Sequence, residues 1–198
     1  MSDLQQPKVL NVGGNNRQVP LPAHFDGWQH VLLDIDPRGE PDLLCDAREL
    51  ETQDAAQFEA IYCSHNLEHY HRHDGARVLA GFRHVLKPGG FAHITVPDLD
   101  AVMRQVVQRG LDVDDVLYTS PAGEILVRDV LYGWSVEIER TGNDFYAHKT
   151  GFSVKSLGRM LAACGFGHVY MGTGNLEVQA YAFDTEPGAE YRALLGLG

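Results

Sequence analysis

Short apolar runs recur along the first half of the chain, and each run ends beside glycine, proline, aspartate or serine. A continuous apolar run of about four to eight residues that ends at turn residues is typical of a strand buried on both faces. Such strands belong to parallel sheets that helices cover, so the pattern predicts an α/β fold. The runs cover residues 8–12, 30–35, 41–45, 58–64 and 91–96.

Helical periodicity alternates with these runs. Besides a first helix at about residues 78–86, a second helix is expected near residues 100–109. A third follows Ser153, a residue type favoured at helix N-caps, and ends at Gly165. The first helix is followed by the breakers Lys-Pro-Gly-Gly at residues 87–90. Its apolar face is formed, at helical spacing, by Val78, Leu79, Phe82, Val85 and Leu86.

The remaining segments complete one predicted domain. Residues 168–171 and 176–183 are expected to be two closing strands joined by a turn at residues 172–175. Residues 186–198 are expected to be a loosely held tail. The 198 residues therefore predict a single domain. Its polar and aromatic insertion at about 100–150 is expected to be either a lid over the substrate or ordinary cover for the sheet edge.

Charge and cysteine content limit the partners. The formal net charge is −11 and lysine and arginine form no run, so the sequence favours neither nucleic acid nor an anionic membrane as a partner. The three cysteines form no CxxC pair, which argues against a disulfide framework. No signal peptide is visible, and no apolar run approaches the ~20 residues that span a bilayer. We expect a soluble, cytoplasmic protein with a small-molecule substrate, and the oligomeric state stays open.

Two features at the ends of predicted strands are typical of a nucleoside-binding site. Ligands of open α/β sheets bind at the carboxyl ends of the strands. Gly13 and Gly14 follow the first strand, where glycine lets the backbone approach a ligand closely. Asp34 lies about 20 residues later, at the position where an acid accepts hydrogen bonds from ribose. A structural turn alone explains these features almost as well.

Further motifs follow the first turn in a fixed order. The set resembles the class I S-adenosylmethionine-dependent methyltransferases of the type 11 branch, over about residues 8–183. The resemblance implies a Rossmann-like fold with helices on both faces of a mostly parallel seven-stranded sheet, whose last strand is antiparallel. It also implies S-adenosyl-L-methionine as the cofactor. The motifs are VLNVGG at 9–14, LDIDP at 33–37, DLLCDA at 42–47, IYCSHNLEH at 61–69, VLKPGG at 85–90, ITVPD at 94–98, YG at 132–133, HKTGF at 148–152 and ACGF at 163–166.

The resemblance also implies which residues meet the cofactor. The turn after the first strand would face the methionine part, Asp34 would hold the ribose, and Asp46 with Ala47 would contact the adenine. Ser64 and His65 would border the methyl group and the acceptor. The predicted cofactor-binding residues are Asn11, Gly13, Gly14, Asn15, Asp34, Asp46, Ala47 and Ser64.

Three residues are the catalytic candidates: His148, His65 and Asp98. Methyl transfer depends mainly on alignment, and a base is needed only when the acceptor carries a proton, as a hydroxyl does. Histidine suits that task because its reference pKa is about 6.5. An equally weighted interpretation is that His148 bonds the backbone and pins the lid. We expect the acceptor to be a small molecule or a saccharide-type metabolite.

Asn15 departs from the family turn, which usually carries a glycine at that position. Asparagine tolerates left-handed backbone better than other non-glycine residues, so the turn is expected to form. Its side chain could instead crowd the cofactor. A non-catalytic binding protein with the same fold is therefore the alternative hypothesis. A nicotinamide-dependent oxidoreductase is a weaker one, because the sequence lacks GxGxxG.

Four histidines and a glutamate cluster after the fourth predicted strand. His65 and His69 are four residues apart and could share a helix face, as metal ligands often do. No third ligand at a fixed spacing is implied, however, for this pair or for the neighbouring His71 and His73. We therefore predict buried or capping roles for the cluster and no metal.

Overall fold

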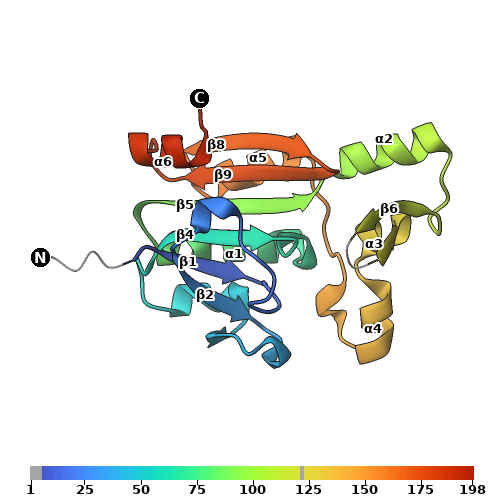
Figure 1. Cartoon of the computed structure of the whole chain (residues 1–198), viewed down its shortest axis with the longest axis horizontal. Helices are drawn as coiled ribbons and strands as arrows, with labels where there is room; N and C mark the ends of the chain where they lie inside the picture. Colours follow the sequence, from blue (N-terminus) through green and yellow to red (C-terminus); the bar gives the residue numbers. More distant parts are fainter. Residues whose placement is uncertain (1–5, 121–122) are drawn as a thin grey trace, which may run out of the picture.

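A computed structural model describes residues 6–120 and 123–198, and a seven-stranded sheet lies at its centre (Figure 1). The strand order is β3-β2-β1-β4-β5-β9-β8. The first five strands pair in parallel, whereas β9 is antiparallel to both β5 and β8. The predicted sheet and its antiparallel last strand are confirmed. The bounds are β1 Lys8–Val12, β2 Gln29–Asp34, β3 Leu43–Leu44, β4 Phe58–Ser64, β5 Leu86–Pro97, β8 His168–Gly174 and β9 Glu177–Phe183.

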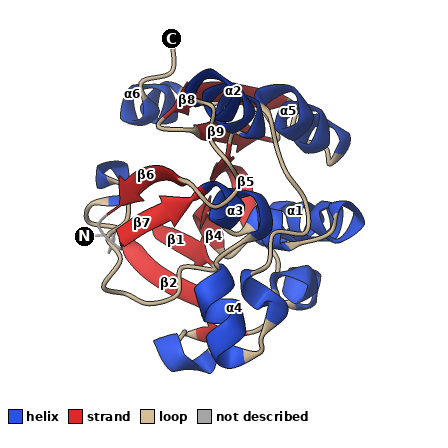
Figure 2. Ribbon diagram, turned by 90° about the vertical axis from the view of Figure 1, so that its right-hand side faces the viewer, coloured by secondary structure: helices blue, strands red, loops and turns tan. Residues whose placement is uncertain are grey.

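Helices cover both faces of this sheet (Figures 1 and 2). Among the described residues, none of the helices is long and apolar enough to span a membrane. The α-helices are α1 Arg72–Val85, α2 Leu99–Arg109, α3 Val127–Tyr132, α4 Ser135–Thr141, α5 Val154–Ala163 and α6 Ala189–Leu195. The 3-10 helices of the described residues are η1 Ala23–Phe25, η2 Pro37–Gly39, η3 Ala47–Thr52, η4 Leu67–His69 and η5 Asp144–Tyr146.

The larger apolar core lies between one face of the sheet and helices α1 and α5. The predicted apolar face of α1 is confirmed for Val78, Leu79, Phe82 and Val85, which are fully buried. The fifth residue of that face, Leu86, begins β5 instead, because the chain turns into the strand directly after Val85. Fully burying a large aliphatic or aromatic side chain contributes ~1.5–3 kcal/mol, so this face fixes α1 on the sheet.

The hairpin between β8 and β9 is tighter than predicted. Residues 172–174 belong to β8, and only Asn175 and Leu176 connect the two strands. Both have positive φ, of 53° and 63°. Two consecutive left-handed residues form the type I′ turn whose twist matches that of paired antiparallel strands. The predicted four-residue turn is therefore wrong, because leucine carries no sequence signal for this backbone.

The last residues form a docked helix, so the expected loose tail is wrong. Helix α6 lies on the sheet face opposite α1, where Tyr191 and Leu195 pack against a second apolar cluster. The Tyr191 ring centroid lies 5.2 Å from that of Phe91 and 6.4 Å from that of Phe183. Aromatic pairs at such separations stabilise a contact beyond the area that they bury.

Residues 99–120 and 123–146 lie beyond the carboxyl edge of the main sheet, at the right of Figure 1 and in front in Figure 2. They form α2, α3 and α4 together with a two-stranded sheet, β6 Val116–Ser120 and β7 Gly123–Leu126. Their own apolar cluster contains Val102, Leu117, Val127 and Val130. We call this part of the chain the lid segment; its closing over a substrate stays a prediction.

Docking of α6 can be tested by one substitution with a matched control. Tyr191→Ala should lower the free energy of unfolding by ~1–3 kcal/mol, because it removes an aromatic ring that packs on two buried phenylalanines. Leu194→Ala, on the same helix but 39% exposed, should change it by ~0.5 kcal/mol or less. Urea denaturation measures both. Equal losses would mean that α6 is not held by Tyr191.

Candidate functional site

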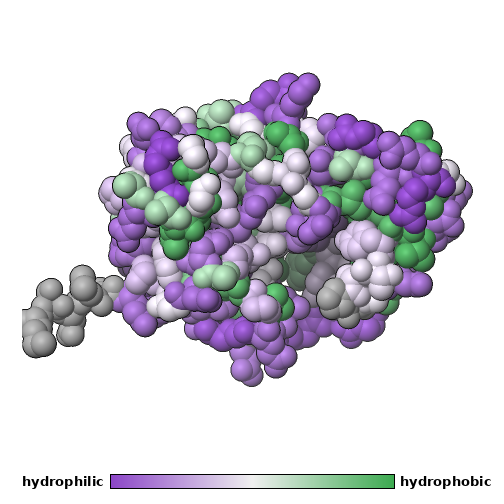
Figure 3. All heavy atoms as spheres, turned by 45° about the horizontal axis from the view of Figure 1, so that its top comes forward, coloured by the Kyte–Doolittle hydropathy of each residue, from purple (hydrophilic) through white to green (hydrophobic). Residues whose placement is uncertain are grey.

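A cleft of about 460 Å³ opens between the carboxyl ends of the parallel strands and the lid segment. Figure 3 shows the molecular surface hollowed on one face, with hydrophobic residues inside the hollow. The sheet contributes Gly13, Asn15, Asp34, Ile35, Asp36, His65, Asn66, His69 and Pro97 to its wall. The hairpin and the lid side contribute Tyr118, Glu124, Ile125, Asp129, Val130, Trp134, Val136, Phe145, Tyr146, His148, Asn175, Leu176 and Glu177.

The turn after β1 has the backbone that the sequence predicted. Gly13 has φ of 70° and Asn15 has φ of 61°, so the asparagine adopts the left-handed conformation. A side chain on Gly13 would also collide with Asn66, which explains why glycine is needed there. The Asn15 side chain is exposed at the cleft.

Asp34 ties this turn to the end of β2. One carboxylate oxygen accepts the backbone N–H of Asn15 at 2.9 Å, and the other accepts the N–H of Asp36 at 2.9 Å. A carboxylate has about four lone-pair sites, so both oxygens can still accept a further hydrogen bond. Asp34 is 8% exposed and lines the cleft. It therefore has both a structural task and free acceptor capacity.

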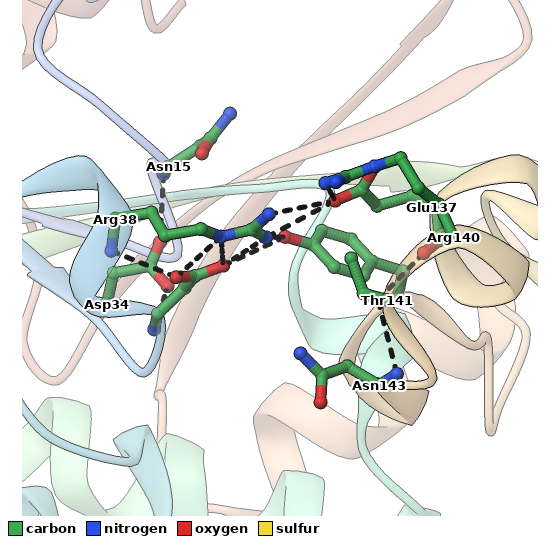
Figure 4. A network of polar contacts seen from close by, with 9 residues as sticks. Asn15, Asp34, Arg38, Glu137, Arg140, Thr141 and Asn143 are labelled. Carbon is green, nitrogen blue, oxygen red and sulfur yellow. Dashed lines mark hydrogen bonds and ion pairs between the residues drawn. The ribbon is translucent and has the colours of Figure 1, made fainter.

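A polar network joins the end of β2 to the lid segment (Figure 4). We call its four residues, Asp36, Arg38, Glu137 and Tyr146, the latch. The Arg38 guanidinium donates to Tyr146 Oη at 2.7 Å and to Glu137 at 3.2 Å, and Tyr146 donates to Asp36 at 3.1 Å. Hydrogen bonds from Arg38 lower the pKa of Asp36 to about 2. No sequence pattern predicts these contacts, which join residues about 100 positions apart.

Asp46 is engaged with its own loop. Its carboxylate accepts the backbone N–H of Arg48 at 2.9 Å and the Arg48 guanidinium at 2.6 Å, and so caps η3. It lines a smaller cavity of about 250 Å³, which shares Ile35 and Asn66 with the cleft. Ala47 is buried in the main core. The adenine contact of Asp46 and Ala47 stays a prediction.

The other predicted cofactor residues lie beneath the cleft wall. Asn11 is buried, and its side-chain amide lies 3.2 Å from His30 Nε2. The Asn11 side chain also packs directly under Gly14. Ser64 is half-buried at the end of β4. Of the eleven residues predicted for cofactor binding and catalysis, the wall of the cleft includes Gly13, Asn15, Asp34, His65 and His148.

His65 directly follows the carboxyl end of β4 and lies between two carboxylates. Its Nε2 is 2.8 Å from Glu177 Oε1, and its Nδ1 is 3.5 Å from Glu68 Oε1. Burial would lower the pKa of His65, but the contacts with Glu177 and Glu68 outweigh it and raise the pKa to about 10. A doubly protonated ring cannot accept a proton. The geometry therefore favours His65 as a fixed cation between two carboxylates and disfavours it as a base.

Asp98 is buried at the start of α2. Its carboxylate accepts the backbone N–H of Asp100 at 3.1 Å, which makes it the N-cap of that helix. Its backbone N–H donates to the Leu176 carbonyl, and a bridge pairs Asp98 with Phe152. These contacts position the lid segment and the β8–β9 hairpin. Asp98 is absent from the residues that line the cleft in the described part of the chain.

His148 is anchored to α3 and keeps one nitrogen free. Its backbone N–H donates to the Tyr132 carbonyl at 3.0 Å, and its ring Nδ1 lies 2.9 Å from the Val130 carbonyl. A carbonyl only accepts, so Nδ1 carries the proton and Nε2 carries the lone pair. Burial lowers the pKa of His148 and favours this neutral ring. Nε2 has no hydrogen-bond partner among residues 6–120 and 123–198. Both predicted roles, base and lid pin, keep support.

A side-chain cluster that the sequence did not reveal lies beside His148. One ligand-type atom from each of Glu68, His69 and His148 lies within 4.8 Å of the others. Glu68 is 1% exposed, and neither of its carboxylate oxygens has a hydrogen-bond partner among the described residues. His71 and His73 stack on each other outside this cluster. The expected absence of a metal stays a prediction.

Comparison with known proteins identifies a family whose model matches part of this chain. The family model of the methyltransferase domain matches residues 13–94. The match covers less than half of the 198 residues. The matched segment includes the glycine turn, Asp34 and the loop after β4, so the resemblance expected from the motifs is confirmed. No curated protein matches the sequence.

Solved methyltransferases share the fold at low identity. A 1,6-didemethyltoxoflavin-N1-methyltransferase from Burkholderia thailandensis, with 1,6-didemethyltoxoflavin and S-adenosylhomocysteine bound, gives a TM-score of 0.53 at 18% identity over 92% of this chain and 72% of that one. A SAM-dependent methyltransferase from Archaeoglobus fulgidus gives 0.55 at 14% identity over 89% and 86%. One from Methanosarcina mazei gives 0.54 at 15% identity over 92% and 94%.

The charge of His65 gives a pH-dependent prediction. Because the folded pKa is raised to about 10, its pairing with Glu177 stabilises the fold fully below pH 6.5 and is lost as pH rises through about 10. Glu177→Gln should remove ~1 kcal/mol or less, since both side chains are partly exposed. Denaturation at several pH values should show this difference vanish in alkali. A wild-type His65 that titrates near 6.5 by NMR would contradict the pairing.

Proposed function

We propose that this protein transfers a methyl group from S-adenosyl-L-methionine to an uncharged or cationic small molecule or saccharide. The observation that carries the proposal is the convergence of the Gly13–Asn15 turn and Asp34 on one cleft, within a segment that matches a methyltransferase domain. The lid segment forms the opposite wall, which leaves room for an acceptor. A cytoplasmic location, expected from the sequence, is part of the proposal.

The residues at the sheet edge fit the cofactor. A Cβ at Gly13 would collide with the Asn66 side chain, so glycine lets this turn pack against the loop after β4 at the edge of the cleft. Asp34 keeps lone pairs for ribose hydroxyls while it holds Asn15 and Asp36. The bound S-adenosylhomocysteine of the Burkholderia structure supports the same choice of cofactor for this chain. The cofactor supplies an electrophilic methyl group on positively charged sulfur.

The charge of the cleft limits the acceptor. Its described wall contains five carboxylates and neither lysine nor arginine, so a phosphate or carboxylate acceptor would meet repulsion. Aromatic rings from the lid segment offer flat faces on which a heterocycle or a sugar can pack. The carboxylates are those of Asp34, Asp36, Glu124, Asp129 and Glu177, and the aromatic residues are Tyr118, Trp134, Phe145 and Tyr146.

For a hydroxyl acceptor, the proposed base is His148. Its Nε2 accepts the hydroxyl proton while the acceptor oxygen bonds the methyl carbon, and the electron pair of the broken carbon–sulfur bond stays on sulfur. His148 leaves the step as an imidazolium whose Nδ1–H still donates to Val130. His65, held as a cation by Glu177, contributes a fixed positive charge at the cleft wall. Asp98 acts indirectly, because it positions α2 and the β8–β9 hairpin.

A non-catalytic binding protein is the second candidate, and Asn15 favours it. Its side chain is exposed where the family turn usually has glycine, and it reaches the cleft. An asparagine that excluded the cofactor would leave the cleft as a binding site for another ligand. Cofactor binding therefore separates the two candidates.

S-adenosylhomocysteine should bind the protein and raise its melting temperature, whereas NAD should not, because a ligand selective for the folded state stabilises it. Asp34→Ala should weaken this binding by ~1–3 kcal/mol, the scale of losing hydrogen bonds to a charged acceptor. The same variant should also melt earlier, because Asn15 and Asp36 lose their acceptor. Calorimetric titration measures the affinity. Unchanged melting at millimolar S-adenosylhomocysteine would reject the enzyme and favour the binding protein.

His148→Asn separates a base from a lid pin. Loss of a general base should lower kcat by ~10²–10⁴ and flatten the acidic limb of the pH profile, with cofactor affinity unchanged. Loss of a pin alone should raise the KM of the acceptor and expose residues 132–152 to proteolysis, because the ring would no longer bond Val130. Steady-state kinetics and limited proteolysis read the two effects. Unaltered kinetics together with unaltered proteolysis would remove His148 from both roles.

A further inference from the structure

Glu68 is a buried charge that the fold leaves without hydrogen bonds. Its side chain is 1% exposed, and neither carboxylate oxygen has a hydrogen-bond partner among the described residues. A buried carboxylate loses its hydration, and its burial is costly unless opposite charge lies close. The main chain of Glu68 has its own structural role, because its carbonyl accepts the N–H groups of Lys149 and Thr150. Those backbone hydrogen bonds do not require a buried carboxylate. The side chain therefore needs another explanation.

The groups around this carboxylate are imidazoles. His65 lies 3.5 Å away by its Nδ1, and ligand-type atoms of His69 and His148 lie within 4.8 Å. Glu68 and His148 also line one small cavity of about 230 Å³, which shares Pro97 and Val130 with the cleft. The buried Cys63 thiol, whose pKa burial raises, completes the titratable groups around Glu68. Lys149 lines the same cavity, but its ammonium pairs with Asp144.

His148 would gain a positive charge when it takes a proton in a half-buried site. Its Nδ1–H already has a partner in the Val130 carbonyl, so the new charge must be stabilised from another direction. A negative charge within about 4–6 Å favours a protonated imidazole by ~1–3 pKa units. Glu68 supplies such a charge, because one of its carboxylate oxygens lies within 4.8 Å of a ring nitrogen of His148.

We infer that Glu68 is a positioning residue that supplies the buried counter-charge for the imidazolium formed on His148 during methyl transfer. This inference rests on the proposed function for the turnover step, but not for the electrostatic pairing itself. Glu68 touches neither the acceptor nor the cofactor and acts through His148. Glu68 also lies 3.5 Å from His65 and, together with Glu177, favours the cationic form of that ring.

A metal ion is the rival occupant of this cluster. His69 disfavours it, because its Nδ1 lies 3.1 Å from the Ala147 carbonyl and its Nε2 lies 3.1 Å from the His65 carbonyl. Each nitrogen thus faces an acceptor, and a metal would have to displace one of these contacts. The cation at His65, 3.5 Å from Glu68, also competes with a metal for the carboxylate. Protonated histidines therefore explain the contacts of this cluster better than a bound metal ion does.

NMR titration of the His148 ring tests the inference in the protein saturated with S-adenosylhomocysteine. Glu68→Gln should lower the pKa of His148 by ~1 unit or more, because the counter-charge is removed. The acidic limb of the kcat profile should move to lower pH by the same amount, and kcat should fall ~10-fold or more, since a weaker base remains. Glu177→Gln is the matched control: it also removes a carboxylate beside His65, but it should leave the His148 titration unchanged.

Three outcomes would overturn the inference. The first is an unchanged His148 titration in Glu68→Gln. The second is one equivalent of metal that the wild type retains and Glu68→Gln loses. The third is a wild-type Glu68 carboxyl that is protonated at pH 7 in ¹³C-labelled protein, a measurement that stays decisive if Glu68→Gln fails to fold. The titrations need no turnover. A lowered His148 pKa in Glu68→Gln, in a protein that transfers no methyl group, would reject the proposed function and retain the pairing of Glu68 with His148.

Discussion

The carboxylate of Asp34 holds together the two loops from which the candidate cofactor site is built. Strands β1 and β2 are parallel neighbours, so their carboxyl ends meet and a single side chain reaches both loops. One oxygen fixes the left-handed Asn15, and the other fixes Asp36. The latch to the lid segment then begins at Asp36. The turn, the proposed ribose contact and one anchor of the lid segment therefore all depend on one charge.

The sequence predicted those parts of the fold that local pattern controls. The runs at 8–12 and 58–64 became β1 and β4 with the same bounds, because a buried parallel strand needs a continuous apolar run. Asn15 was predicted left-handed for an equally local reason. The α6 helix and the turn at Asn175 and Leu176 were missed, because tertiary contact and strand twist determine them. Neither leaves a strong signal in neighbouring residues.

The residue types of the candidate site could be predicted from the sequence, but the protonation states of its histidines could not. Sequence placed His65 and His148 near the acceptor, and both line the cleft. Their partners, Glu177 for His65 and Val130 for His148, come from distant segments. Contact with Glu177 favours a cationic ring on His65, whereas burial outweighs the contact with Val130 and favours a neutral ring on His148. Protonation depends on contacts across the fold, so no local motif predicts which histidine can accept a proton.

The latch bridges the two walls of the cleft beside β2. A ligand that enters or leaves on that side must separate Arg38 from Glu137 and break the hydrogen bonds that join Tyr146 to Arg38 and Asp36. Dissolved ions reach Arg38, whose side chain is 49% exposed, and they weaken ion pairs that solvent can reach. The residence time of a ligand that uses this route would therefore shorten as ionic strength rises, even where its own contacts with the cleft carry no charge.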